Sequence, residues 1–322
     1  MVHPRLLAIA VPVTLLVLAA SSLRADNTRA EAALRQGRVD EARSLLQASL
    51  QQNPVDSEAR QLLCRVYYAQ EMGDEAIHEC ELAAVQAPSD SENQMWLGRA
   101  YGLKASHTNM IAAFRLAKKV RTAFEQAAQL DDSNFQAMND LGDFYVQAPG
   151  IVGGGVDKAQ ALADRMEPRF PAQAHRLRGS IAEKNNDLTV AETEFKAAIA
   201  AGRSADAYID LAGFYSRQHR VDEAVATVHA AVAADRAKDA VLVDAATILT
   251  DVQRSPELAE RLLREYLASP AKSDAAPAFK VHVQLGKLLA KDGDSAGEQA
   301  ELAAAQALAH GYKAARNPQE GQ

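Results

Sequence analysis

The sequence predicts an all-α solenoid in which about eight antiparallel helix pairs stack one upon the next. Composition is the first reason: about a fifth of the 322 residues is alanine and only 5% is aromatic, which favours closely packed helices over a sheet. The second reason is an internal period, because Pro54 and Pro88 lie 34 residues apart and each ends a helix-like stretch. A two-helix unit of that length cannot bury its apolar faces alone, so neighbouring units must stack.

Residues 1–25 are predicted to be a signal peptide and not part of the fold. Arg5 precedes an apolar run at residues 6–20, and small residues follow as far as Ala25. This run of 15 residues is shorter than the roughly 20 that a spanning helix needs, which favours cleavage over an uncleaved anchor. The first cysteine is Cys64, so no lipid anchor is expected at a mature N-terminus. These features predict a periplasmic or secreted protein with no membrane span in the mature chain.

Residues 57–90 define the repeat. Leu63, Cys64 and Tyr67 stand at repeat positions 7, 8 and 11, and Ala76 and Cys80 stand at positions 20 and 24. Units that begin at residues 91, 135 and 205 again place large residues at positions 7 and 11 and a small residue at position 8. We expect this small residue to face the small residue at position 20, so that the two helices of a unit approach closely.

Two segments, Leu97-Gly-Arg-Ala-Tyr101 and Leu141-Gly-Asp-Phe-Tyr145, contain the L-G-x2-Y part of the pattern W-x2-L-G-x2-Y. The chain thereby resembles the tetratricopeptide repeat family, and its signal sequence resembles that of exported bacterial members. Gln94 and Met138 stand where the family has tryptophan. The resemblance implies a right-handed superhelical solenoid over residues 26–312, a tail at 313–322, and a role in binding proteins. The polar first and last helix pairs are expected to act as caps.

Two units exceed the period of 34 residues. The unit that begins at residue 91 runs for 44 residues, and the one that begins at residue 135 runs for 37. The excess predicts enlarged loops at Gly102–Thr108 and Ala148–Gly155, and equivalent turns of consecutive units lie side by side in a solenoid. We therefore expect one joint loop surface, with Lys104 and His107 as candidate partner-binding residues. The alternative is a pair of tolerated surface insertions.

The sequence gives no sign of catalytic chemistry. A net charge of −7 and a pI of about 5.7 argue against nucleic acid as the partner. The glycine run at residues 150–155 is not a phosphate-binding loop, because Val156 and Asp157 follow where Lys and Ser or Thr are required. The histidines are scattered without the spacing of metal ligands. We therefore expect no catalytic residues, no cofactor, no metal and no enzyme activity.

The two cysteines occupy repeat positions 8 and 24 on facing helices of one unit. In an oxidising compartment Cys64 and Cys80 could form a disulfide. The alternative is a pair of buried thiols in a helix interface, since cysteine is often buried. The sequence leaves both open, because it does not give side-chain direction.

The first helix of each unit is expected to line the concave face with positions 2, 5, 9 and 12. The candidate partner-binding residues there are Arg65, Tyr68, Met95, Arg99, Asn139 and Asp143, with Arg176 and Ile209 in later units. Arginines that pair carboxylates, set beside apolar side chains, suit an extended peptide or a partner helix. The sequence thus predicts an exported, non-catalytic protein-binding or scaffolding module. The alternatives are a ligand-binding accessory subunit of an envelope transport system and an enzyme with an unrecognised site in the loops.

Overall fold

The computed structural model describes residues 25–316, and nearly all of them lie in helices joined by short turns. Residues 1–24, most of the predicted signal peptide, lie outside the described residues. Residues 25–35 form the first helix. The elements that follow are α2 (Val39–Gln52), α3 (Ser57–Ala69), α4 (Gly73–Gln86), α5 (Ser91–Ser106), α6 (Met110–Leu130), α7 (Phe135–Gln147), η1 (Gly150–Val152), α8 (Val156–Met166), α9 (Pro171–Lys184), α10 (Leu188–Gly202), α11 (Ala205–Arg217), α12 (Val221–Ala234), α13 (Ala240–Asp251), α14 (Pro256–Ala268), α15 (Ala278–Lys291), α16 (Ser295–Leu308) and α17 (Lys313–Arg316).

Polar side chains at the unit boundaries determine where several helices begin. The carboxylate of Asp56 accepts a hydrogen bond from the backbone N–H of Ala59 at 3.0 Å, at the start of α3. Asn134 does the same for Ala137 at 3.0 Å, and Ser204 caps α11. Each cap satisfies a backbone N–H that has no partner inside the helix. The first turn of the next unit is therefore fixed locally.

The helices form pairs, as the repeat predicts. Within residues 25–316 there are eight antiparallel pairs, the last being α15 with α16, and α17 follows them. Contacts also join α3 to α5, α7 to α9, and α11 to α13, whereas no comparable contact joins the described even-numbered helices. The odd-numbered helices thus lie on the inside of the curve, where neighbours crowd together.

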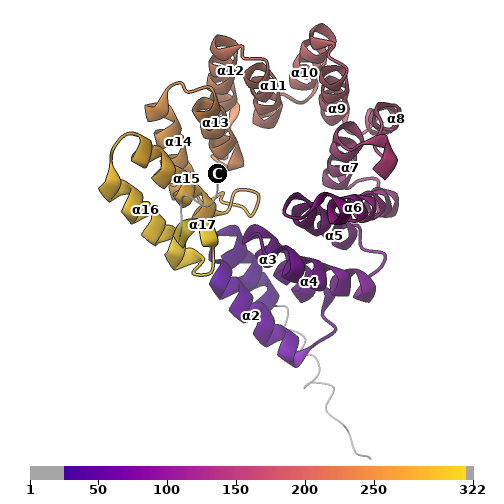
Figure 1. Ribbon diagram of the computed structural model, residues 1–322, viewed down its shortest axis with the longest axis vertical. Helices are drawn as coiled ribbons and strands as arrows, with labels where there is room; N and C mark the ends of the chain where they lie inside the picture. Colours follow the sequence, from indigo (N-terminus) through magenta and orange to yellow (C-terminus); the bar gives the residue numbers. More distant parts are fainter. Residues whose placement is uncertain (1–24, 317–322) are drawn as a thin grey trace, which may run out of the picture.

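The solenoid closes on itself. Figure 1 shows the chain running once around an open centre, so that α15–α17 come to lie beside α2 and α3. Ala30 and Leu34 of the first helix share one buried cluster with Phe279 and Tyr312. The expectation that the first and last pairs are separate polar caps is therefore wrong: the repeats complete one turn, and the two ends bury apolar surface against each other.

Polar contacts across the closure support the apolar ones. The backbone N–H of His310 donates to Asp40 at 2.7 Å, and Lys280 pairs with Glu71 at 2.6 Å. Glu71 also accepts from the hydroxyl of Tyr312 at 3.3 Å. Residues 313–316, which the sequence assigns to a tail, form α17 with Ala315 buried in the closing cluster. Residues 317–322 lie outside the described residues.

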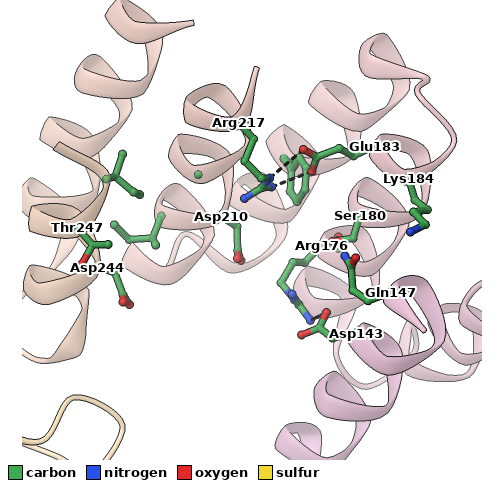
Figure 2. A pocket seen from close by; sticks show the side chains of 14 residues that line it. Asp143, Gln147, Arg176, Ser180, Glu183, Lys184, Asp210, Arg217, Asp244 and Thr247 are labelled. Atoms are coloured by element: carbon green, nitrogen blue, oxygen red, sulfur yellow. Dashed lines mark hydrogen bonds and ion pairs between the residues drawn. The ribbon is translucent and has the colours of Figure 1, made fainter. Parts of the chain in front are cut away.

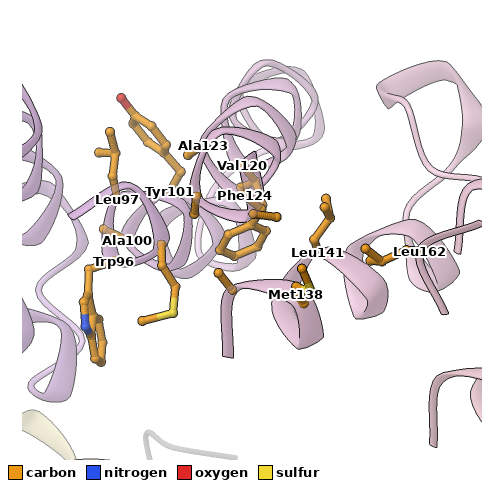
Figure 3. Packing of buried hydrophobic residues seen from close by; sticks show 14 of the residues in the cluster. Trp96, Leu97, Ala100, Tyr101, Val120, Ala123, Phe124, Met138, Leu141 and Leu162 are labelled. Carbon is orange, nitrogen blue, oxygen red and sulfur yellow. The ribbon is translucent and has the colours of Figure 1, made fainter. Parts of the chain in front are cut away.

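The small residue at repeat position 8 contacts position 24 of its own unit in two places. Cys64 and Cys80, which occupy these positions, are joined as a disulfide with their Cα atoms 5.3 Å apart. A Cβ on Gly98 would overlap the ring of Phe124, and one on Gly179 would come within 3.0 Å of Phe195. Figure 3 shows Phe124 in one cluster with residues of α5 and α7. Close approach of the two helices is as predicted, and position 24 takes part in the contact.

The first predicted loop is mostly helix. Residues 102–106 belong to α5, and only residues 107–109 connect it to α6. Ala, Leu and Lys in this stretch are strong helix formers, and Asn109 caps α6 by accepting from Ala112 at 3.1 Å. The insertion therefore lengthens a helix pair, giving an α6 of 21 residues. Among residues 25–316 no helix, α6 included, is long and apolar enough to cross a membrane.

The second insertion, residues 148–155, folds onto the side of α6. It includes η1, and the backbone N–H of Gly155 donates to Tyr145 O at 2.8 Å. Gly153 has φ of +100° and packs against Arg121, where a Cβ would overlap the guanidinium. Gly102, where the first predicted loop begins, lies near Val120, the neighbour of Arg121 in α6. The first insertion is helical, however, so the two do not form a pair of adjacent loops.

Candidate functional site

A groove of about 720 Å³ opens on the inner face of the solenoid between α7, α9, α11 and α13. Figure 2 shows the side chains that line it. They are predominantly polar and come from consecutive odd-numbered helices. The residues are Asp143 and Gln147 of α7, Arg176, Ser180, Glu183 and Lys184 of α9, Ile209, Asp210, Gly213 and Arg217 of α11, Asp244, Thr247 and Ile248 of α13, and Phe195 of α10.

The two arginines of the groove are already neutralised. Arg176 Nη2 donates to Asp143 Oδ1 at 2.9 Å. Arg217 binds Glu183 through two bonds, from Nε at 2.9 Å and from Nη2 at 2.8 Å, the bidentate geometry that suits a guanidinium and a carboxylate. Both pairs are drawn in Figure 2. These arginines hold neighbouring inner helices together and carry little unbalanced positive charge into the groove.

Two carboxylates in the groove form no ion pair. Among the described residues, neither Asp210 nor Asp244 has a hydrogen bond or an ion pair, and Figure 2 shows both side chains pointing to the same side of their helices. Burial raises the pKa of Asp210 to about 6, helped by the charge of Asp143 and opposed by Arg176. Burial and the charges of Asp206 and Asp239 raise the pKa of Asp244 to about 6. The lining of the groove has four carboxylates, Asp143, Glu183, Asp210 and Asp244, and three cations, Arg176, Lys184 and Arg217, so a small excess of negative charge remains.

The raised pKa of Asp210 predicts that this carboxylate opposes folding. Because the folded pKa of about 6 exceeds the unfolded one of 3.8, the cost is absent only well below pH 4, grows between about pH 4 and 6, and levels off above that. We expect Asp210→Asn to raise the free energy of unfolding by about 1 kcal/mol at about pH 7.5 and by much less at about pH 4. Urea denaturation at both pH values, with the exposed Asp251→Asn as control, checks this. A loss of stability at about pH 7.5 would show that Asp210 is compensated.

Only one candidate partner-binding residue of the first three units lies in this groove. Asp143 lines it, and so do Arg176 and Ile209, which the concave positions also predict. Met95 is only 2% exposed, and the prediction that it lines the concave face is wrong. It is buried because α5 packs against α3, α4, α6 and α7 at once. Asn139 is half-buried beside the groove, and its Oδ1 has no hydrogen-bond partner.

Arg65, Tyr68 and Arg99 surround Trp96 instead of facing open solvent. The guanidinium groups of Arg65 and Arg99 lie 5.3 Å and 4.6 Å from the centre of its ring, and the ring of Tyr68 meets it edge-on at 5.5 Å. Arg99 also pairs with Asp140 at 2.6 Å. Arg65 pairs at 2.9 Å with Asp274, in the segment between α14 and α15 that crosses the closure. These contacts assign the group a structural role.

Lys104 and His107 lie at a second hollow of about 780 Å³, beside the closure. Glu71 and Tyr312 also line it. Lys104 pairs with Asp74 at 2.7 Å, and His107 Nδ1 lies 2.9 Å from the backbone oxygen of Leu103. The two residues are thus close to each other, as the sequence predicts, but separate from the groove.

Asp210 and Asp244, which sequence reasoning missed, show a simple signal. They follow the predicted Arg176 at spacings of 34 residues, so the three occupy one repeat position on three consecutive inner helices. Equivalent positions in a solenoid line up across its face. A search for charged residues at the repeat spacing finds this row. In the part of the chain that the structure describes, no group of three His, Cys, Asp or Glu side chains is arranged to hold a metal.

Comparisons with known proteins agree with the helix pairing. Sequence models of the tetratricopeptide repeat match residues 33–99, 153–206 and 176–240. Yeast Tom70 has a similar fold, with 16% identity, a TM-score of 0.52, and coverage of 88% of this chain and 59% of that one. A tetratricopeptide repeat protein from Parabacteroides merdae gives 14% identity, a TM-score of 0.49 and coverage of 77% and 93%. A thermophilic tetratricopeptide repeat protein from Thermus thermophilus has 18% identity and a TM-score of 0.41, with coverage of 77% of this chain and 99% of that one. No curated protein matches the sequence.

The matched segments coincide with the helix pairs. Residues 33–99 run from the first helix into α5, and residues 153–240 include most of the groove. The helices between and beyond these segments continue the same pairing, and the likeness to Tom70 shows the same fold at low identity. The chain is a tetratricopeptide repeat protein.

Proposed function

We propose that this protein is an exported, non-catalytic binding module that holds an extended segment of a partner protein in its inner groove. The observation that carries the proposal is the pair of unpaired carboxylates, Asp210 and Asp244, one repeat apart on adjacent helices. Tetratricopeptide repeats bind proteins or peptides as a family, and an inner groove between stacked units suits an extended chain.

The charges favour a basic segment. Arg176 and Arg217 are paired with Asp143 and Glu183, so an acidic peptide would have to break two ion pairs to use them. A Lys or Arg side chain placed between Asp210 and Asp244 would meet carboxylates that have no other partner. Such a contact would lower both pKa values from about 6, and the free energy that corresponds to this lowering would favour binding. We therefore expect binding to weaken as the pH falls below 6.

Export rests on the N-terminal sequence and is supported by the disulfide. Residues 6–20 have the length and composition of a signal sequence, and Cys64 and Cys80 are joined, as suits an oxidising compartment. We expect native protein to begin near Asp26 and to take up no alkylating reagent until it is reduced. Intact mass before and after reduction and alkylation measures both. A mass that includes residues 1–25, or two thiols alkylated without reduction, would contradict the proposal.

Photo-crosslinking tests the groove as the binding surface. A benzoylphenylalanine at Gln147, on the groove, should crosslink to a discrete partner in the native host, and the product should be lost in the Asp210→Asn/Asp244→Asn variant. The same probe at Val190, exposed on α10, is the control and should give no such product. Equal crosslinking from both positions, or a product that survives the double substitution, would place binding elsewhere.

A further inference from the structure

The first half of α6 is a surface that the repeat does not need. Ordinary second helices of this protein, such as α4 and α12, have 14 residues, whereas α6 has 21. The buried residues of α6 all lie between Val120 and Ala128. Residues 110–119 have no fully buried side chain: the side that includes Leu116 packs against the core, and the other side is exposed.

Apolar and basic side chains share the outward side of this extension. At 100° per residue, Met110, Ile111, Phe114, Arg115 and Lys118 fall within an arc of about 140°, on the side of α6 opposite its buried residues. The side chain of Met110 is 86% exposed and that of Ile111 is 71% exposed. Exposed apolar residues of this size, gathered on one stripe, indicate an interaction surface.

The charge around the stripe is positive in a protein that is negative overall. Residues 93–124 contain six Lys or Arg and no Asp or Glu, in a chain of net charge −7. Lys119 pairs with Glu81, and Arg121 with Glu125. Among the described residues, Arg115 and Lys118 have no carboxylate partner, and Lys118 lies 4.6 Å from the ring centre of Phe114. Two uncompensated cations thus lie directly beside the exposed apolar side chains.

From this arrangement we propose that residues 110–118 of α6 dock the protein onto an anionic lipid surface. Met110 and Ile111 enter the headgroup region, while Arg115 and Lys118 contact lipid phosphates, which is how interfacial helices divide apolar and basic side chains. The stripe lies on the exposed side of a helix, and its residues line none of the grooves described above. The groove between α7 and α13 belongs to other helices and stays open.

Flotation of the full mature protein with lipid vesicles tests this proposal. The probes are vesicles of phosphatidylcholine alone and of phosphatidylcholine with phosphatidylglycerol, at low salt. We expect binding to the anionic vesicles only, and a partition coefficient about thirtyfold lower for Arg115→Gln/Lys118→Gln, which corresponds to about 1 kcal/mol for each cation. The Met110→Ser/Ile111→Ser variant should also lose binding to the anionic vesicles in the same assay.

Matched controls separate this site from general charge and apolarity. Arg261→Gln/Lys291→Gln removes two other exposed cations, and Val85→Ser removes an apolar side chain that is 77% exposed on α4. Both variants should bind as the wild type does. The proposal is overturned if the anionic vesicles bind no protein, if the controls lose binding equally, or if light scattering shows a dimer that Met110→Ser/Ile111→Ser dissociates.

Discussion

Replacing Gly98 with leucine is expected to destabilise the fold by about 3 kcal/mol, the upper end of the usual cost of overpacking a core. Gly98 stands at repeat position 8 of α5, and even a Cβ there would overlap the ring of Phe124, which is 7% exposed. Phe124 has no room to move, because it is enclosed by residues of α5 and α7 in the same cluster (Figure 3). Urea denaturation measures the loss.

Gly102 provides the matched control on the same helix. It lies one turn beyond Gly98, and a Cβ there would meet only Val120, at 4.0 Å. Gly102→Leu should therefore change the free energy of unfolding by less than about 1 kcal/mol. Equal losses for the two variants would show that the assignment of position 8 to the helix interface is wrong.

Substituting valine for Gly37 is expected to open the ring. Gly37 has φ of +76°, and a Cβ would lie 2.8 Å from the backbone nitrogen of Ala278 across the closure. A β-branched residue is strained at positive φ, and here it would also collide with backbone that cannot move as a side chain can. We expect the first and last units to separate, which would increase the radius of gyration in small-angle X-ray scattering and lower stability by about 3 kcal/mol.

Gly293 isolates the contribution of backbone strain. It has φ of +84°, and a Cβ there would meet nothing within 4 Å. Gly293→Val should cost only the strain, about 1–2 kcal/mol, and leave the radius of gyration unchanged. Figure 1 shows the two ends of the solenoid side by side. Equal radii of gyration for Gly37→Val and Gly293→Val would show that the ends are not held together in this way in solution.

The sequence predicts local structure well because the repeat encodes it locally. The period of 34 residues and the small residue at position 8 depend on contacts within one unit or between neighbours, and each recurs several times. The contact between the two ends of the solenoid occurs only once among the described residues. The pairing of Arg65 with Asp274 joins residues 209 apart and depends on the sum of small rotations between units, which no single unit specifies. For this reason the sequence predicts Arg65 on an open face, whereas the structure places it at the closure.

The groove shows how a small error in register hides a site. A unit of 37 residues from residue 135 puts the start of the next unit at residue 172, which is 33 residues before the unit at 205. The helices α9 and α11 instead begin at Pro171 and Ala205, 34 residues apart. With that shift corrected, Asp210 aligns with Arg176 and becomes visible as a concave-face residue. The absence of a partner for Asp210 and Asp244 could not be predicted, because it depends on where Arg176 and Arg217 find their carboxylates.

The most direct test of the central claim is a random peptide library displayed on phage and selected on the immobilised mature protein. The account predicts that the selected peptides share a Lys or Arg. The Asp210→Asn/Asp244→Asn variant should bind them about tenfold more weakly, or by about 1.4 kcal/mol. Replacing the shared basic residue of a peptide with Gln should cause no further loss of affinity for that variant. Asp251→Asn/Asp292→Asn, outside the groove, should bind as the wild type does. Peptides without a shared basic residue, or peptides that bind the Asp210→Asn/Asp244→Asn variant as tightly as the wild type, would contradict the account.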